Sequence, residues 1–309
     1  MSRFLLRRLL HALFVVWGAV TVIFVIVRLV PGDPAAVMLG PSASPQQLAT
    51  LRERLGIDQP LVTQYVTYLL DALRLDFGDS LRLGIPAGEA VLRKMPPTVA
   101  LGVTALVVSL LVSVPLGVRA TQSPGGIVDR AIRLLSLVGQ MVPTFWVGIV
   151  LLLVFSRGLR LLPSTGASSP AHFILPVITL TLPLIGTLVR LVRAGLLEVL
   201  DEPYVQAARA KGVRERTVLY RHAVPNMLIP VVTVIGLMLG DLIAGLVLVE
   251  IVFAWPGMGR LLVDSISDRD YPVVQASVAV IALSYVVINM FVDVLYGVLD
   301  PRVRLGESR

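Results

Sequence analysis

Apolar runs long enough to span a membrane alternate with short basic segments along most of this chain. A transmembrane helix needs roughly 17 to 25 apolar residues, at a rise of 1.5 Å per residue. Six runs are of this kind and are nearly free of charge: 9–27, 98–118, 134–155, 173–189, 227–249 and 273–292. The pattern predicts an all-α membrane protein with six transmembrane helices.

One sizeable polar segment, residues 31–97, interrupts the pattern after the first run. Ser44 followed by Pro45 and Gln47 has the capping-box arrangement of a helix start, and Gly56 is placed to end that helix. A second helix is expected over 60–74. We expect a small helical segment outside the membrane, too short to be a separate enzyme domain. The predicted organisation is 1–30, an N-terminal tail and first span; 31–97, an extracytoplasmic helical segment; and 98–309, a five-helix core.

Composition supports membrane insertion and excludes cysteine chemistry. Of the 309 residues 56% are hydrophobic and only 15% are charged, whereas globular proteins carry about 25% charged residues. The net charge of +7 could suggest nucleic-acid binding. The arginines cluster beside apolar runs, however, so membrane orientation explains them better. The chain contains no cysteine, which excludes disulfides and thiolate ligands.

The distribution of basic residues predicts the orientation of the spans. The N-terminal tail, segments 119–133 and 190–226, and the C-terminal tail carry sixteen lysines and arginines together, whereas the two short opposite loops carry four. Because basic residues favour the cytoplasmic side, both termini are predicted to be cytoplasmic. The first run is longer than a signal-peptide core and lacks a clear cleavage site, so we expect an uncleaved span.

The most basic interruption, residues 201–225, reads as two short helices between the fourth and fifth spans. Asp201 is a good N-cap with Pro203 in the first turn, and Gly212 is placed to end the first helix in a left-handed conformation. The second helix is expected over 214–222, with Pro225 beginning the next span. Ala207 and Ala208 make one side of the first helix small, so another surface can approach its backbone. A helix lying on anionic lipid headgroups is the alternative.

A few polar residues fall at membrane depth. Asp241 is the one carboxylate well inside an apolar run, where charges normally face protein or a wet cavity. It is a candidate for lining a transport pathway; a helix break at Gly240 that leaves it in a water-filled vestibule is the alternative. Asn289 is a second pathway candidate, although Asn289 and Gln140 also suit interhelical hydrogen bonds. Glu250 is expected at the membrane interface.

Several motifs are missing from the sequence. It has no GxxxxGK[ST] phosphate loop and no HExxH zinc motif. A GxGD-type membrane protease would need glycine where Met238 stands, and the three histidines are scattered. The chain is therefore not expected to be an enzyme or to bind ATP, a cofactor or a metal itself.

The spacing of Ala207, Ala208 and Gly212, followed by the pair Val224-Pro225, resembles the EAA loop of importer-type ABC transporter permeases. Gln206 stands where the general motif has glutamate. Five blocks in family order extend the resemblance to the B-type permease subunit of dipeptide, oligopeptide and nickel ABC importers: RRLLHALFVVWGAVTVIFVIVRLVPGDP, LGIDQPLVTQYVTYLL, YVQAARAKGVRERTVLYRHAVPNMLIPVVT, EIVFAWPGMGRLLVDSISDRDYPVV and VDVLYGVLDPRVR.

This resemblance implies a half-channel in a prokaryotic cytoplasmic membrane, with a type I permease fold and alternating access. It implies a homologous C-type permease as heterodimer partner, two ATPase subunits or domains that bind ATP and Mg, and an extracytoplasmic substrate-binding protein. Loop 201–225 would then be the cytoplasmic coupling loop. The residues implied to contact the ATPase are Tyr204, Gln206, Ala207, Ala208, Lys211 and Gly212.

The implied substrate is a di- or oligopeptide, with nickel chelates, glutathione or oligosaccharides as alternatives. Three other functions are alternatives to ATP-driven import. An ion-coupled secondary transporter would show internal repeats and broken helices around buried charges, and only Asp241 is a candidate here. An intramembrane enzyme would need paired catalytic groups within spans. A purely structural membrane scaffold would suit the spans and the docking loop equally well.

Overall fold

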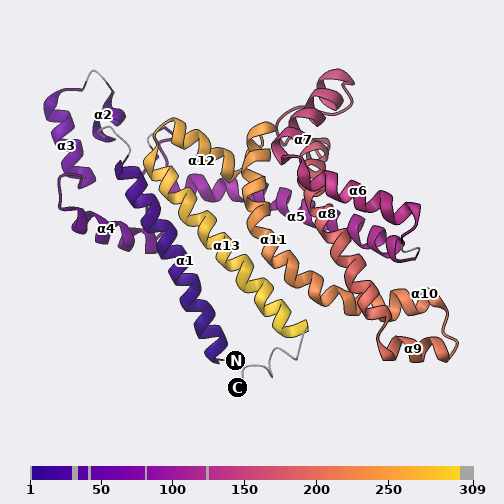
Figure 1. Cartoon of the computed structure of the whole chain (residues 1–309). Coiled ribbons are helices and arrows are strands. Elements are labelled where there is room, and N and C mark those ends of the chain that lie inside the picture. Colours follow the sequence, from indigo (N-terminus) through magenta and orange to yellow (C-terminus); the bar gives the residue numbers. More distant parts are fainter. Residues whose placement is uncertain (1, 30–33, 41–42, 81, 123–124, 300–309) are drawn as a thin grey trace. The chain divides into compact units, whose positions relative to one another are not determined.

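The computed structural model describes residues 2–29, 34–40, 43–80, 82–122 and 125–299. The regular secondary structure of these residues is helical, apart from one isolated β-bridge between Asp79 and Pro86. The helices along the chain are α1 (Ser2–Leu29), α2 (Pro34–Leu39), α3 (Pro45–Leu55), α4 (Leu61–Leu73), α5 (Ala87–Thr121), α6 (Ile127–Met141), α7 (Thr144–Leu151), the π-helical η1 (Leu152–Gly158), α8 (Ala171–Leu200), α9 (Pro203–Ala210), α10 (Glu215–Thr217), the π-helical η2 (Val218–Ala223), α11 (Val224–Val252), α12 (Met258–Ser267) and α13 (Tyr271–Leu299) (Figure 1).

Among the described residues, four helical stretches are long and apolar enough to cross a membrane: Leu10–Leu29, Ala87–Thr121, Ala171–Leu200 and Tyr271–Val292. Two bent helix pairs raise the number to six if each pair is one span. One pair joins Val234–Gly240 to Leu242–Val252 with a bend of 45°. Helices accordingly cover all six predicted runs.

The third predicted span is not one straight helix. The apolar run 134–155 is divided between α6 and α7, and the segments Asp129–Met141 and Thr144–Gly158 meet at 100°. Pro143 is the N-cap of α7. Proline has no amide for a helical hydrogen bond, and it disfavours the helical conformation at the residue before it. The third predicted run is therefore a bent helix pair with its break at Pro143.

The polar segment between the first two spans forms the expected helices but ends earlier than predicted. Ser44 accepts from the Gln47 amide while the Gln47 side chain accepts from the Ser44 amide, which confirms the capping box. Gly56 ends α3 at φ 63°, as expected. Helix α5 already begins at Ala87. The last eleven residues of the predicted polar segment, 87–97, therefore belong to the helix that continues into the second span.

The chain divides into two compact units. The first comprises Met1–Pro96 and Gly257–Val286. Its buried core contains Val20, Phe77, Ala87, Val91, Met258, Val273, Ala276, Ala279 and Val280. The Ser80 hydroxyl donates to the carboxylate of Asp270, which is itself buried immediately before α13 (O···O 2.5 Å).

The second unit comprises Pro97–Pro256 and Val287–Arg309, and its core lies between α8, α11 and α5. Trp255 is completely buried and donates from Nε1 to the Pro97 carbonyl at 3.1 Å. Glu250 is also completely buried, and its carboxylate accepts from the Thr98 hydroxyl at 2.5 Å. Glu250 is thus enclosed by protein, which differs from the interfacial position expected from its place near the end of an apolar run.

Helices α6 and α8 of the second unit approach each other unusually closely. A Cβ at Gly186 would lie 2.4 Å from the Ser136 carbonyl oxygen, and one at Gly139 would lie 3.0 Å from the Leu182 carbonyl oxygen. Any side chain at Gly186 would force the two backbones apart, because a backbone oxygen cannot rotate away. The glycines therefore allow α6 and α8 to pack as one tight pair.

Candidate functional site

The loop between the fourth and fifth predicted spans folds around the short helix α9. Figure 1 shows α9 and α10 at the far end of α8, where the chain turns back into α11. The N-cap of α9 is Glu202, with Pro203 at the first helical position. Asp201 is instead the C-cap of α8. The expectation that Asp201 starts the helix was therefore wrong by one residue, because α8 continues to Leu200 and Pro203 fixes the start of the next helix.

The predicted break between the loop and the fifth span is absent. After the N-cap Arg214, α10, η2 and α11 follow one another without a non-helical residue between them. Pro225 lies in the first turn of α11 and cannot donate an amide hydrogen bond. The wider π-helical turn of η2 immediately precedes it and accommodates this loss. The second half of the loop is thus a direct extension of α11.

Gly212 ends α9 through a Schellman motif. Its φ is 75°, in the left-handed region, as the sequence predicted. The Gly212 amide donates to the Arg209 carbonyl at 2.9 Å, and the Val213 amide donates to the Ala208 carbonyl at 3.2 Å. These are the two hydrogen bonds that define the motif. The turn fixes the direction in which the chain leaves α9.

Substitution of Gly212 should loosen this turn without any steric clash. A Cβ at Gly212 would meet nothing within 4 Å, so only the backbone conformation opposes alanine, by about 1–2 kcal/mol. In Gly212→Ala we expect amide hydrogen exchange in α9 to accelerate roughly 5- to 30-fold. Gly212→Asn should show a smaller effect, because asparagine tolerates the left-handed region. Unchanged exchange in both variants would contradict this account.

Helix α9 has one anchored face and one open face. Val205 is completely buried and anchors the helix. Tyr204, Ala207 and Lys211 are exposed and Ala208 is partly exposed, and positions i, i+3, i+4 and i+7 share one side of a helix. Gln206 lies on the other flank, where its side-chain amide donates to the Asp201 carbonyl at 3.1 Å. The open face thus combines two alanines with a tyrosine and a lysine.

Polar contacts tie α9 to both long helices beside it. Arg209 donates to the Glu215 carboxylate at 2.6 Å and 3.1 Å, and to the Leu200 carbonyl of α8 at 3.4 Å. The side-chain amide of Asn226 in α11 donates to the Tyr204 hydroxyl at 3.0 Å. A displacement of α9 would therefore be transmitted to α8 and α11 together.

The Arg209–Glu215 pair is exposed, and its electrostatic contribution is small. The hydrogen bond from Arg209 lowers the pKa of the Glu215 carboxyl, and the same bond raises the pKa of Arg209. Because the folded-state pKa of Glu215 is depressed, the pair stabilises the fold above the ordinary carboxyl pKa. That contribution is lost as the pH falls through the lowered value. Both side chains are at least 40% exposed, so we expect less than about 1 kcal/mol.

A buried ion cluster joins α6 to α8, the helix that leads into α9. The Asp129 side chain is completely buried and accepts from Arg193 Nε at 2.7 Å and Nη2 at 3.1 Å. Arg133 lies 3.1 Å from the same carboxylate, and the Gly125 amide donates to it at 2.9 Å. Sequence reasoning missed this cluster because Asp129 stands among arginines in a segment that was counted only for its basic charge.

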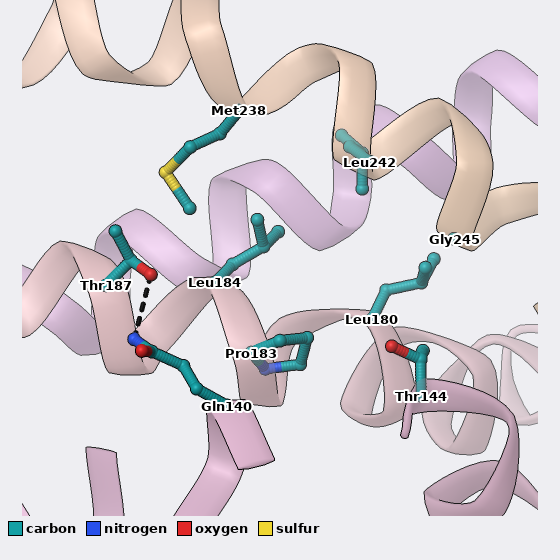
Figure 2. Close-up of a pocket in the computed structure, with 9 residues that line it drawn as sticks. All are labelled: Gln140, Thr144, Leu180, Pro183, Leu184, Thr187, Met238, Leu242 and Gly245. Carbon is teal, nitrogen blue, oxygen red and sulfur yellow. Dashed lines mark hydrogen bonds between the residues drawn. The ribbon is translucent and has the colours of Figure 1, made fainter. Parts of the chain in front are cut away.

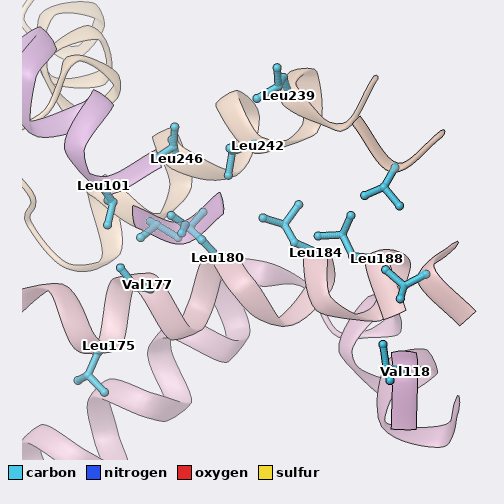
Figure 3. Close-up of a cluster of buried hydrophobic side chains, with 14 of the residues drawn as sticks. Leu101, Val118, Leu175, Val177, Leu180, Leu184, Leu188, Leu239, Leu242 and Leu246 are labelled. Atoms are coloured by element: carbon cyan, nitrogen blue, oxygen red, sulfur yellow. The ribbon is translucent and has the colours of Figure 1, made fainter. Parts of the chain in front are cut away.

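A cavity of about 260 Å³ lies between α6, α7, α8 and α11 of the second unit. Figure 2 shows Met238 and Leu242 of α11 opposite Leu184 of α8, with Gln140 and Thr187 at one end. The side-chain amide of Gln140 donates from Nε2 to the Thr187 hydroxyl at 2.8 Å, and Arg190 donates to Gln140 Oε1 at 2.7 Å. The expectation that Gln140 makes an interhelical hydrogen bond is confirmed. The cavity lies at the interface between α8 and α11. Figure 3 shows the buried leucines of this interface.

Of the two residues predicted to line a pathway, the structure describes the side chain of Asn289 only. Asp241 belongs to α11 at its 45° bend, next to the cavity residue Leu242. Its side chain lies outside the part of the chain whose side chains are described. Asn289 of α13 is partly buried and does not line this cavity. The bend occurs where the sequence suggested a helix break beside Gly240.

Comparison with known protein families gives matches over most of the chain. Residues 113–305 match the family described as binding-protein-dependent transport system inner membrane component. Residues 1–82 match the N-terminal domain of the corresponding membrane components. The first match includes α9 and the helices that surround the cavity.

Similar proteins cover nearly the whole chain. A probable peptide ABC transporter permease protein (y4tP) of Sinorhizobium fredii is 41% identical over 98% of this chain and 100% of its own length. The glutathione transport system permease protein GsiC of Escherichia coli K12 is 38% identical over 98% of this chain and 99% of its own length. A chain of the MetNI methionine ABC transporter, in an inward-facing conformation, is similar in fold. It has a TM-score of 0.54 and 16% identity, over 68% of this chain and 96% of that one.

Proposed function

Because this chain belongs to the family of binding-protein-dependent transport system inner membrane components, we propose that it is the permease through which an ATP-driven importer admits di- or oligopeptides. The names of two similar proteins support this substrate class, since one is a probable peptide permease and the other a glutathione permease. Glutathione is itself a tripeptide. Short peptides therefore account for both relatives better than nickel chelates or oligosaccharides do.

The open face of α9 is the proposed site at which an ATPase subunit docks. The observation that carries this proposal is that α9 exposes Ala207 and partly exposes Ala208 on one side, while buried Val205 anchors the helix. A small-residue surface lets a groove on another protein close around the helix backbone. Tyr204 and Lys211 frame that surface. Gln206 and Gly212, which the resemblance also implies as ATPase contacts, support the two turns of the loop.

Coupling then follows from the contacts of α9. ATP and Mg bind in the partner ATPases, and closure of the ATPase dimer would move the docked α9. Since Arg209 and Asn226 tie α9 to its neighbours, the motion reaches α8 and α11. Helix α6 would follow α8 through the Asp129–Arg193 ion pair. The cavity lies between helices α6, α7, α8 and α11, so the same motion would change access to it.

The proposed assembly has three further parts. A homologous permease chain completes the channel, and an extracytoplasmic binding protein delivers the substrate. The charge asymmetry of the sequence supports an orientation in which both termini and α9 lie on the cytoplasmic side. This orientation places α9 where ATP is available. The chain itself carries out no chemical step.

Reconstitution into proteoliposomes tests the proposal. The tagged chain is purified with its accompanying subunits, and uptake of a labelled dipeptide is measured with and without ATP on the ATPase side. We expect uptake only with ATP and the binding protein. Uptake that persists after removal of every ATPase subunit would indicate an ion-coupled transporter instead. Titration of the accompanying binding protein with dipeptides, glutathione, a nickel chelate and an oligosaccharide separates the substrate classes.

A further inference from the structure

Helix α4 of the first unit has three distinct faces. Tyr65, Tyr68, Leu69 and Ala72 face the protein, where the last three pack against the unit's core. Val62, Val66, Leu70 and Leu73 form an exposed apolar stripe, with exposed fractions of 74%, 48%, 54% and 81%. Thr63 and Thr67 are exposed on the third side, beside the partly exposed Asp71. A surface helix of a soluble protein shows only the first and third of these faces.

The contacts of α4 fall on the last three turns of a candidate membrane span. Thr21 of α1 lies 2.7 Å from the Tyr65 hydroxyl, and the Phe24 ring packs on both tyrosines. Arg28, in the last turn of α1, donates to the Gln64 side chain at 3.0 Å and 2.8 Å. The candidate span of α1 runs from Leu10 to Leu29. Figure 1 shows α4 crossing α1 rather than running alongside it.

This level of α1 has the chemistry of a membrane boundary. Val22, Val25, Ile26 and Leu29 of α1 are exposed apolar residues that a bilayer would cover. Tyrosines concentrate at the boundary between acyl chains and water, and a long basic side chain at a span end reaches the headgroups. Tyr65 and Arg28 provide both features where α4 meets α1.

We propose that α4 lies in the plane of the membrane interface, with Val62, Val66, Leu70 and Leu73 inserted among lipid acyl chains. An amphipathic helix at an interface buries its apolar face to a depth of roughly 5–10 Å. The stripe contains only valine and leucine, whereas protein interfaces are enriched in aromatic residues and arginine. Its purely aliphatic composition therefore fits lipid better than a partner subunit. The threonine side would face water. The polar segment between the first two predicted spans is thereby held against the bilayer.

Single-cysteine spin labelling tests this placement. The chain contains no cysteine, so Val66→Cys, Leu70→Cys and the control Thr67→Cys each create one labelling site in it. The labelled, transport-competent complex is reconstituted in phosphatidylethanolamine–phosphatidylglycerol vesicles. Collision rates are then measured with oxygen, which partitions into lipid, and with a water-soluble nickel chelate.

We expect the oxygen-to-nickel ratio at positions 66 and 70 to exceed that at position 67 several-fold. Two results would overturn the proposal. Equal nickel accessibility at 66, 67 and 70 would show that water covers the stripe. Protection of positions 66 and 70 from both reagents would show that another protein chain covers it.

Discussion

Ala207→Trp should reduce peptide uptake about tenfold or more while leaving the protein folded and membrane-inserted. Ala207 is exposed on the open face of α9, so the indole projects outward, and surface substitutions of this kind change stability by only about 0.5 kcal/mol. On the docking surface the same indole would hold the ATPase groove away from the helix backbone. A tenfold loss corresponds to about 1.4 kcal/mol of docking free energy. ATP hydrolysis by the partner should continue without driving uptake.

The matched control is Ala210→Trp. Ala210 is also an exposed alanine of α9, but it lies outside the face formed by Tyr204, Ala207, Ala208 and Lys211. We expect uptake by this variant to stay close to that of the unmodified chain. Ala208→Trp should behave like Ala207→Trp. Normal uptake by both tryptophan variants of the open face, with normal amounts in the membrane, would count against α9 as the coupling element.

Removal of the Asp129 carboxylate should cause the largest loss of stability. Asp129 is completely buried and Arg193 is only 21% exposed, so Asp129→Ala leaves a largely buried guanidinium without its bidentate partner. Breaking a buried pair in this way costs about 3–5 kcal/mol. We expect a value near 3 kcal/mol, because Arg193 keeps some contact with solvent. Equilibrium unfolding in mixed detergent–SDS micelles, followed by tryptophan fluorescence, measures the change.

Two comparisons distinguish the contribution of the ion pair from a nonspecific loss of stability. Glu89→Ala removes an exposed partner of Arg93 and should cost no more than about 1 kcal/mol. The double variant Asp129→Ala with Arg193→Ala should be more stable than the sum of the two single losses predicts. The coupling energy for such neighbours is typically about 0.5–3 kcal/mol. Additive losses would mean that the two residues do not stabilise α6 and α8 through each other.

Local features of the loop 201–225 and of the polar segment 31–97 were predictable from the sequence. The capping box at Ser44, the left-handed Gly212 and the small residues Ala207 and Ala208 each depend on a few neighbouring positions. The start of α9 was missed by one residue, because Asp201 and Glu202 are both acidic and only the end of α8 decides between them. The family resemblance depended on the same short motifs and on their order along the chain.

Only part of the candidate site could be predicted from such local sequence features. Asp129 and Arg193 are 64 residues apart, and nothing in either neighbourhood distinguishes them from other charged residues near span ends. Glu250 likewise looked interfacial, but the packing of α5 on α11 encloses it. Gln140 was recognised as a hydrogen-bonding residue, whereas its place at a cavity required the fold.

The sequence by itself determined that this protein is a helical membrane protein with a small-residue loop helix, because hydropathy, charge and helix-ending glycines act over a single segment. Only the tertiary structure decided the 100° turn at Pro143, the union of the second loop helix with α11, and the ion pair that joins α6 to α8. These features depend on which helices pack together. A leucine that faces lipid and one that faces another helix look alike in the sequence, so the pattern cannot specify that choice.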